Sequence, residues 1–174
     1  MDSSFHLDDA QKSFILRVGT TFAADICSTH ARPAAPYTSH LRGSPGTGKS
    51  LLVLSLQKLC ALIVEHHLCS QDEIDSCILL VTHNGAPAQL IGGQTLDSVI
   101  NSFSPAASLE NVFLGSVRLV VVEECSSVCW WKLALLSIGF CHPKPGGSGS
   151  YMNPFDGVSV VAVYDVCRLG PVKD

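Results

Sequence analysis

The apolar residues of this chain gather in short runs that alternate with longer segments of mixed polarity. Four of these runs predict β-strands, at residues 37–42, 77–82, 117–123 and 158–164. The last three are continuous and rich in β-branched residues, which is typical of strands covered on both faces of a parallel sheet. Helices are predicted at residues 8–27, 50–68, 95–101 and 130–136. This alternation predicts an α/β fold with a mostly parallel sheet and right-handed crossovers.

Two segments predict surface connections rather than regular elements. Residues 30–36 carry two prolines and separate the first helix from the first strand. Residues 143–154 are rich in glycine, serine and proline, a composition typical of a mobile loop. We therefore divide the chain into an N-terminal helical segment, residues 1–36, and an α/β domain, residues 37–174.

The composition narrows the class of protein. Of 174 residues, 47% are hydrophobic and 15% charged, which suits one globular domain with a buried core. The net charge of -4 argues against a strongly basic nucleic-acid surface but leaves room for a local groove. The start, Met1-Asp2-Ser3-Ser4, is unlike a signal peptide, and the apolar runs are too short or interrupted to span a bilayer. We expect a soluble intracellular protein without a membrane partner.

Eight cysteines are present, none of them paired at C-x-x-C spacing. One grouping has residue types that suit zinc: Cys125, Cys129, Cys141 and His142. The alternative interpretation is that the cysteines act as small apolar residues, because Cys60, Cys77 and Cys167 lie inside apolar runs. Without a secretory signal, the sequence does not predict a disulfide framework.

The most specific pattern is GSPGTGKS at residues 43–50, which fills every fixed position of the phosphate-binding loop G-x-x-x-x-G-K-[ST]. Glycines let the backbone curl so that several N–H groups point at one anion. Lys49 can reach the β- and γ-phosphates of a nucleotide, and the Ser50 hydroxyl suits Mg²⁺. A predicted strand precedes the loop and a long apolar helix follows it, as the motif requires. The alternative is a glycine-rich turn that happens to carry a lysine.

The nucleotide-binding residues predicted around this loop are Gly43, Ser44, Pro45, Gly46, Thr47, Gly48, Lys49, Ser50 and Leu51. Gln11 joins them, because its amide can pair with the donor and the acceptor on an adenine edge. Taken alone, a glutamine on a helix is usually just solvated. Asp8 or Asp9 is suited to cap the helix that carries Gln11.

An apolar strand that ends in two carboxylates supplies the second half of such a site. We assign Glu123 to the Mg²⁺ side and Glu124 to the base that polarises the attacking water. Aspartate is the usual first residue of such a pair. Glutamate is longer by one methylene, and Mg²⁺ demands near-ideal octahedral geometry, so we expect hydrolysis to be slow or absent. Two solvated glutamates at a strand end are the alternative.

Two further segments follow predicted strands. Residues 83–98 contain small and polar residues that can contact the phosphate or sugar oxygens of a nucleic acid strand. The candidates are Asn84, Gly85, Gln94, Thr95 and Ser98. A glycine-containing turn followed by a capped helix gives the same pattern.

Arg168 follows the fourth strand and has two interpretations. It is either a catalytic residue that senses the γ-phosphate or a surface cation paired with Asp165.

Taken together, these segments resemble superfamily 1 DNA helicases of the PIF type (petite integration frequency), close relatives of RecD. Leu7-Asp8-x-x-Gln11 looks like the adenine-reading Q motif of that family, and residues 43–50 match its motif I. Residues 85–98 are similar to the segment that includes motif Ia. Residues 120–124 resemble motif II and residues 164–172 resemble motif III.

The chain departs from the family pattern outside motif I. Glu123 replaces an aspartate, Asp97 a histidine, Tyr164 a glycine, and Arg168 the glutamine that senses phosphate. Motif I is intact while the motifs that couple nucleotide to DNA have changed.

The resemblance implies a RecA-like P-loop NTPase, a three-layer sandwich that binds ATP and Mg²⁺, hydrolyses the γ-phosphate and contacts single-stranded DNA. It also implies a role in DNA repair and recombination and a nuclear or mitochondrial location. The chain ends soon after motif III, before the family's second RecA-like domain. We therefore expect a truncated or degenerate helicase domain that cannot unwind DNA alone, with a partner as a possible source of the second domain. The alternatives are a catalytically impaired nucleotide-binding or interaction module and a small P-loop kinase.

Overall fold

The computed structural model describes residues 7–28, 36–67, 77–103, 114, 116–141 and 153–167. Helices and strands alternate along this part of the chain. Their bounds are α1 Asp9–Cys27, β1 Thr38–Gly43, α2 Lys49–His67, β2 Ile78–Thr82, α4 Gly85–Leu90, β3 Gln94–Thr95, α5 Leu96–Asn101, β4 Leu119–Glu123, α6 Trp130–Cys141 and β5 Ser159–Asp165. Two short 3-10 turns, η3 Cys125–Ser127 and η4 Pro154–Gly157, flank α6.

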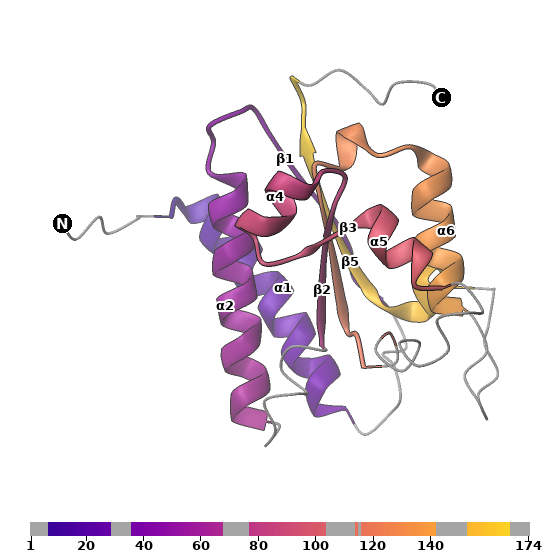
Figure 1. Cartoon of the computed structure of the whole chain (residues 1–174). Coiled ribbons are helices and arrows are strands. Elements are labelled where there is room, and N and C mark those ends of the chain that lie inside the picture. The colour runs from indigo at the N-terminus through magenta and orange to yellow at the C-terminus, as the bar shows by residue number, and fades with distance from the viewer. Residues whose placement is uncertain are drawn as a thin grey trace.

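The strands form one sheet in the order β1-β5-β4-β2-β3, and every neighbouring pair is parallel (Figure 1). This confirms the predicted α/β fold with a parallel sheet. Because the strands are parallel, all their carboxyl ends meet at one edge. There Gly43 of β1 is in register with Asp165 of β5, and Glu123 of β4 is in register with Thr82 of β2.

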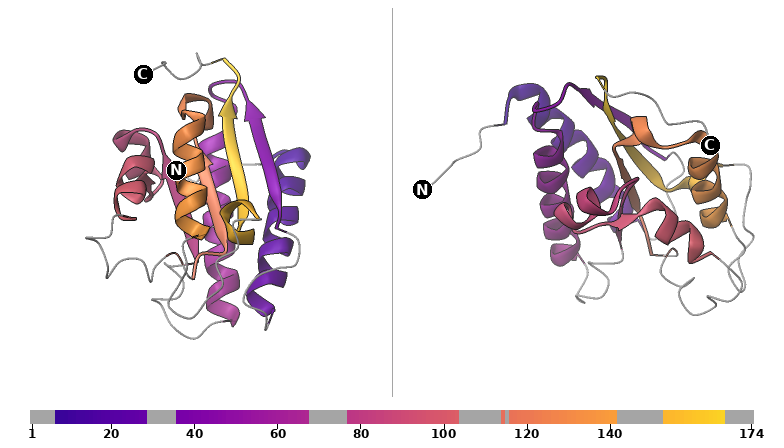
Figure 2. Two further views of the ribbon diagram at one scale, coloured as in Figure 1. Left: turned by 90° about the vertical axis from the view of Figure 1, so that its right-hand side faces the viewer. Right: turned by 45° about the horizontal axis from the view of Figure 1, so that its top comes forward.

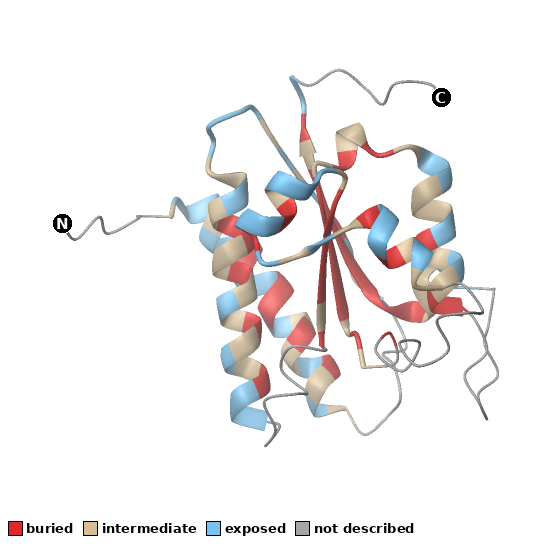
Figure 3. Ribbon diagram, viewed as in Figure 1, coloured by how far each residue is buried: buried red, intermediate tan, exposed pale blue. Residues whose placement is uncertain are grey.

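Helices cover both faces of the sheet, giving three layers. α1 and α2 lie on one face and α5 and α6 on the other (Figure 2). Each interface has its own apolar cluster, with Leu52 and Leu56 of α2 in one and Leu136 and Phe140 of α6 in the other. The strands β2, β4 and β5 are buried along most of their length (Figure 3), as strands covered on both faces are, whereas the edge strands β1 and β3 are mostly exposed or half-buried.

The helices that flank the site form for local reasons. In α2, Leu52, Leu56, Cys60 and Val64 recur every four residues and are all buried, so one stripe of the helix faces the sheet. In α1, the Asp8 carboxylate accepts from the Gln11 backbone N–H at 2.8 Å, and the Gln11 side chain accepts from the Asp8 N–H at 3.0 Å. This capping box satisfies N–H groups that the first turn leaves without partners.

Two parts of the secondary structure differ from prediction. α6 continues to Cys141 rather than ending at Leu136, because Phe140 follows Leu136 by one turn on the same buried face. Neither α4 nor β3 was predicted. α4 has only six residues and includes a proline, and β3 has only two residues, so neither produces a periodic signal. The predicted loop at residues 143–154 lies almost entirely outside the described residues.

A search of the described helices finds none with the length and hydropathy that crossing a bilayer requires.

Gly93 holds the turn between α4 and β3 against the sheet. A Cβ at this position would lie 2.6 Å from the backbone oxygen of Leu80 in β2, a contact with the main chain that no side-chain rotation relieves. We predict that Gly93→Ala lowers the free energy of unfolding by about 1–3 kcal/mol, as overpacking does. Gly85→Ala is the control, because a Cβ there meets nothing within 4 Å. Urea denaturation should show a lower midpoint for Gly93→Ala alone, and equal midpoints would contradict the close approach.

Candidate functional site

The phosphate-binding loop joins β1 to α2 at the carboxyl edge of the sheet. Gly46 and Gly48 each have a φ of 78°, in the left-handed region that favours glycine. The Thr47 hydroxyl donates to the Ser44 carbonyl at 2.8 Å, which closes the turn. α2 begins inside the loop, so its first N–H groups and the positive end of its dipole lie at the same place.

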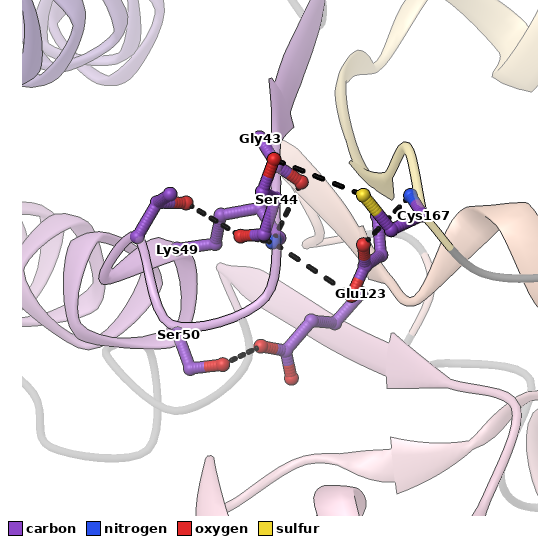
Figure 4. Close-up of polar contacts among 8 residues, drawn as sticks. Gly43, Ser44, Lys49, Ser50, Glu123 and Cys167 are labelled. Carbon is purple, nitrogen blue, oxygen red and sulfur yellow. Dashed lines mark hydrogen bonds and ion pairs between the residues drawn. The ribbon is translucent and has the colours of Figure 1, made fainter.

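The Lys49 ammonium lies inside this loop (Figure 4). It donates to the carbonyl oxygens of Gly43, at 2.8 Å, and Ser44, at 2.7 Å. It also lies 3.9 Å from a carboxylate oxygen of Asp165 at the end of β5, whose side chain is 7% exposed. The loop therefore places one ammonium beside one buried carboxylate, and each offsets the cost of burying the other.

Ser50 and Glu123, the two predicted metal ligands, touch each other. The Ser50 hydroxyl donates to Glu123 Oε1 at 2.5 Å (Figure 4). Glu123 ends β4 and is 4% exposed, whereas Ser50 is on the first turn of α2. A hydroxyl oxygen beside a buried carboxylate is a hard, oxygen-only donor set, and it fits Mg²⁺.

Glu124 follows in an unusual backbone conformation. Its φ of 55° and ψ of 34° are left-handed, which costs a residue with a Cβ about 1–3 kcal/mol. Such strain persists where the surroundings determine it, and it turns the chain sharply from β4 into η3. Both glutamates line the same cavity.

That cavity has a volume of about 630 Å³ and two chemically different walls. One wall is polar and consists of the loop with Glu123, Glu124 and Asp165. The other is apolar and is formed largely by α4, through Ala86, Pro87, Leu90 and Ile91. Sequence analysis noted Asp165 only as an acid after the fourth strand and a possible partner of Arg168, and it did not foresee the contact with Lys49. It missed the α4 wall, because α4 gives no sequence signal.

Gln11 lies beside the loop although it is distant in sequence. Its amide nitrogen donates to the Thr47 carbonyl at 3.4 Å. Its amide oxygen is engaged by the Asp8 N–H in the capping box. Both ends of the amide thus take part in the fold, and this contact fastens the start of α1 to the phosphate-binding loop.

The residues predicted to contact nucleic acid lie after β2, within β3 and at the start of α5. Asn84 and Gly85 are exposed at the start of α4. The Thr95 hydroxyl accepts from the Ser98 N–H at 3.2 Å and so caps α5. The capped helix that we considered as an alternative is therefore present. Gln94 is exposed in β3.

Arg168, the predicted γ-phosphate sensor, lies outside the described residues, and so does His142 of the possible zinc grouping. In the described ranges, no three histidine, cysteine, aspartate or glutamate side chains are arranged to hold a metal ion.

The prediction that cysteines act as small apolar residues holds for Cys60 and Cys77, which are buried. It is wrong for Cys167, which is exposed because it follows β5 in a surface turn, 3.8 Å from the Ser44 hydroxyl.

Burial changes the chemistry of two thiols and one phenol. It raises the pKa of Cys60 to about 12. It also raises the pKa of Cys125, against the opposing effect of a hydrogen bond with Tyr164. That same hydrogen bond, followed by burial, raises the pKa of Tyr164 to about 12. These groups are uncharged near neutral pH, which suits their places in the apolar clusters: Cys60 in the cluster formed with α1 and α2, and Cys125 and Tyr164 in the cluster on the opposite face of the sheet.

Comparison with known proteins identifies the fold. No family model matches the chain, and no curated protein matches it in sequence. A Pif1 helicase from Candida albicans is similar, with 21% identity and a TM-score of 0.67 over 97% of this chain and 35% of that one. A Pif1 helicase from Bacteroides, solved in complex with ADP-AlF3 and ssDNA, has 17% identity and a TM-score of 0.66 over 98% of this chain and 35% of that one.

The fold is therefore the RecA-like P-loop NTPase fold of Pif1 helicase domains. The chain spans roughly a third of the length of these helicases. Another Bacteroides Pif1 structure, bound to ssDNA, gives a TM-score of 0.63 at 17% identity. The likeness extends over nearly all of the chain, so the loop and the strand tips belong to one fold rather than to a chance arrangement of motifs.

The thiols provide a test of this packing. We predict that iodoacetamide at about pH 8 labels the exposed Cys27 and Cys167 in the folded protein and spares Cys60. The thiolate is the nucleophile, and a pKa of about 12 keeps Cys60 protonated at that pH. Peptide mass spectrometry measures each site, and a sample in denaturant shows that Cys60 can react. Equal labelling of all three thiols in the folded protein would contradict the burial of α2.

Proposed function

We propose that this chain is an ATP-binding domain of a PIF-type DNA helicase and that it hydrolyses ATP with Mg²⁺. The proposal rests on one observation: the Ser50 hydroxyl donates a hydrogen bond to the Glu123 carboxylate. This contact lies next to the Lys49 ammonium, in an intact phosphate-binding loop. It joins the two halves that a P-loop NTPase needs, one from the start of α2 and one from the tip of β4. The likeness of the fold to Pif1 helicases supports the same assignment.

Each group at the site has a proposed task. The loop N–H groups of residues 43–51 and the Lys49 ammonium bind the triphosphate. Ser50 and Glu123 hold Mg²⁺, which when bound neutralises phosphate charge. Glu124 accepts a proton from the water whose oxygen bonds to the γ-phosphorus, while the bond from that phosphorus to the β–γ bridging oxygen breaks. Arg168 is proposed to contact the γ-phosphate. Gln11 is proposed to lie near the adenine.

The proposal extends to single-stranded DNA. The exposed start of α4, with Asn84 and Gly85, and the start of α5, with Thr95 and Ser98, lie at the carboxyl edge of the sheet. In open parallel sheets this is the edge where ligands bind. The Bacteroides Pif1 structures that this fold resembles include ssDNA complexes, which supports the choice of ligand. We propose that unwinding needs a second RecA-like domain, supplied by a partner or by more of the same protein.

One observation favours a second candidate function, a nucleotide-binding module with little or no turnover. Glu123 stands where the helicase pattern has aspartate, and its longer side chain reaches the Ser50 hydroxyl directly. The cation must displace or share this hydrogen bond. Phosphate binding by the loop does not depend on Glu123, so nucleotide can bind even where hydrolysis is slow.

Lys49 tests nucleotide binding. We predict that Lys49→Ala weakens the affinity for a fluorescent ATP analogue about tenfold or more, because the loop loses its one charged phosphate donor. Lys58→Ala is the matched control, since Lys58 is an exposed lysine on the same helix, away from the loop. Titration with Mg²⁺ present measures both. Wild-type affinity in the Lys49 variant would remove the loop from the proposal.

Glu124 tests hydrolysis separately from binding. We predict that wild-type protein releases phosphate from ATP at a low rate that rises with a single-stranded oligonucleotide. Glu124→Gln should retain ATP affinity and lower the rate about 10²–10⁴-fold, because the amide cannot accept the proton of water. Phosphate release with and without oligonucleotide measures this. Tight binding with no turnover in either protein would instead support the binding module.

A further inference from the structure

Thr82, the last residue of β2, is an exception in an otherwise apolar strand. The strand reads Ile-Leu-Leu-Val-Thr, and the Thr82 side chain is fully buried, at 0% exposure. Its hydroxyl oxygen is buried and has no hydrogen-bond partner among the residues that the structure describes. A buried hydroxyl without a partner lowers stability, whereas valine has the same shape and no such cost. Stability alone therefore favours valine at this position.

The sheet places Thr82 beside Glu123. The two residues are in register on adjacent parallel strands, which lie about 4.8 Å apart. Leu80 and Val121, two residues earlier in each strand, both pack in the cluster formed with α1 and α2. Since side chains alternate along a strand, Thr82 and Glu123 point to that same face, where Ser50 begins α2. The unpartnered hydroxyl thus belongs to the residue of β2 that directly neighbours the proposed metal-binding Glu123 in the sheet.

We propose that Thr82 is a positioning residue for Glu123: its hydroxyl donates a hydrogen bond to the carboxylate and holds it toward Ser50 when nucleotide and Mg²⁺ bind. This inference rests on the proposed function. Ser50 engages only Oε1 of Glu123, and a carboxylate has further acceptor positions. Glutamate has one more rotatable bond than aspartate, so a second fixed contact restricts a side chain that would otherwise have several orientations.

Thr82→Val and Thr82→Ser, in the full chain, separate positioning from packing. We predict that without nucleotide Thr82→Val melts at the wild-type temperature or up to roughly 4 °C higher, because it loses an unpaired buried hydroxyl. The Mg²⁺ concentration for half-maximal binding of a fluorescent ATP analogue should rise about tenfold in Thr82→Val. Thr82→Ser keeps the hydroxyl and should require Mg²⁺ close to the wild-type concentration.

The inference is overturned if Thr82→Val and wild-type protein require the same Mg²⁺ concentration, or if Thr82→Ser is as impaired as Thr82→Val. Should Thr82→Val not fold, Thr82→Ser and Thr82→Ala provide the same comparison, because both lack the methyl group and differ in the hydroxyl. Wild-type protein that binds no ATP analogue at any Mg²⁺ concentration overturns the proposed function itself. Wild-type binding with unchanged variants overturns only the role of Thr82.

Discussion

The candidate site depends on the parallel pairing of β1, β5, β4 and β2. Only parallel strands bring all their carboxyl ends to one edge, and there the register aligns Gly43 with Asp165 and Glu123 with Thr82. Parallel strands also need crossover connections, and the crossover from β1 begins with α2 inside the phosphate-binding loop. A slip of one residue between β4 and its neighbours would turn Glu123 to the opposite face.

The charges at this edge balance one another in a way that suits a phosphate ligand with a cation. Two carboxylates, Glu123 and Asp165, are nearly buried, and such groups are costly without partners. Asp165 has the Lys49 ammonium and Glu123 has the Ser50 hydroxyl. Among the described residues, the partner of Glu123 is thus neutral, whereas Asp165 has a charged one. This arrangement suits the proposed ligands: a divalent cation would supply positive charge beside Glu123, and the loop amides and Lys49 favour a triphosphate.

The sequence predicts most of this fold because its main elements have strong local patterns. Local sequence alone predicts β2, β4 and β5, because each is a short run of apolar, often β-branched residues. It also predicts α2, whose buried residues recur every four positions. The elements that escape prediction are those whose structure is imposed by neighbours. α4 and β3 are too short to have a period, and β3 exists because Val81 and Thr82 provide a strand to pair with. The loop residues and the glutamate pair could be assigned from motifs, but the contact of Lys49 with Asp165 arises only from the register of β1 with β5.

The proposed nucleotide binding and the proposed ATP hydrolysis depend on different parts of this structure. A substitution can therefore alter hydrolysis and leave nucleotide binding unchanged. Phosphate contacts come from the turn between β1 and α2, which is closed by its own hydrogen bonds and by Gln11. The carboxylates proposed for metal binding and catalysis come from the tip of β4, where Glu124 has a strained backbone and Glu123 accepts a hydrogen bond from Ser50. Lengthening the carboxylate at position 123 alters the metal geometry without touching the loop. The chain therefore combines a complete phosphate-binding loop with a longer carboxylate at position 123, and the proposed nucleotide binding depends on the loop alone.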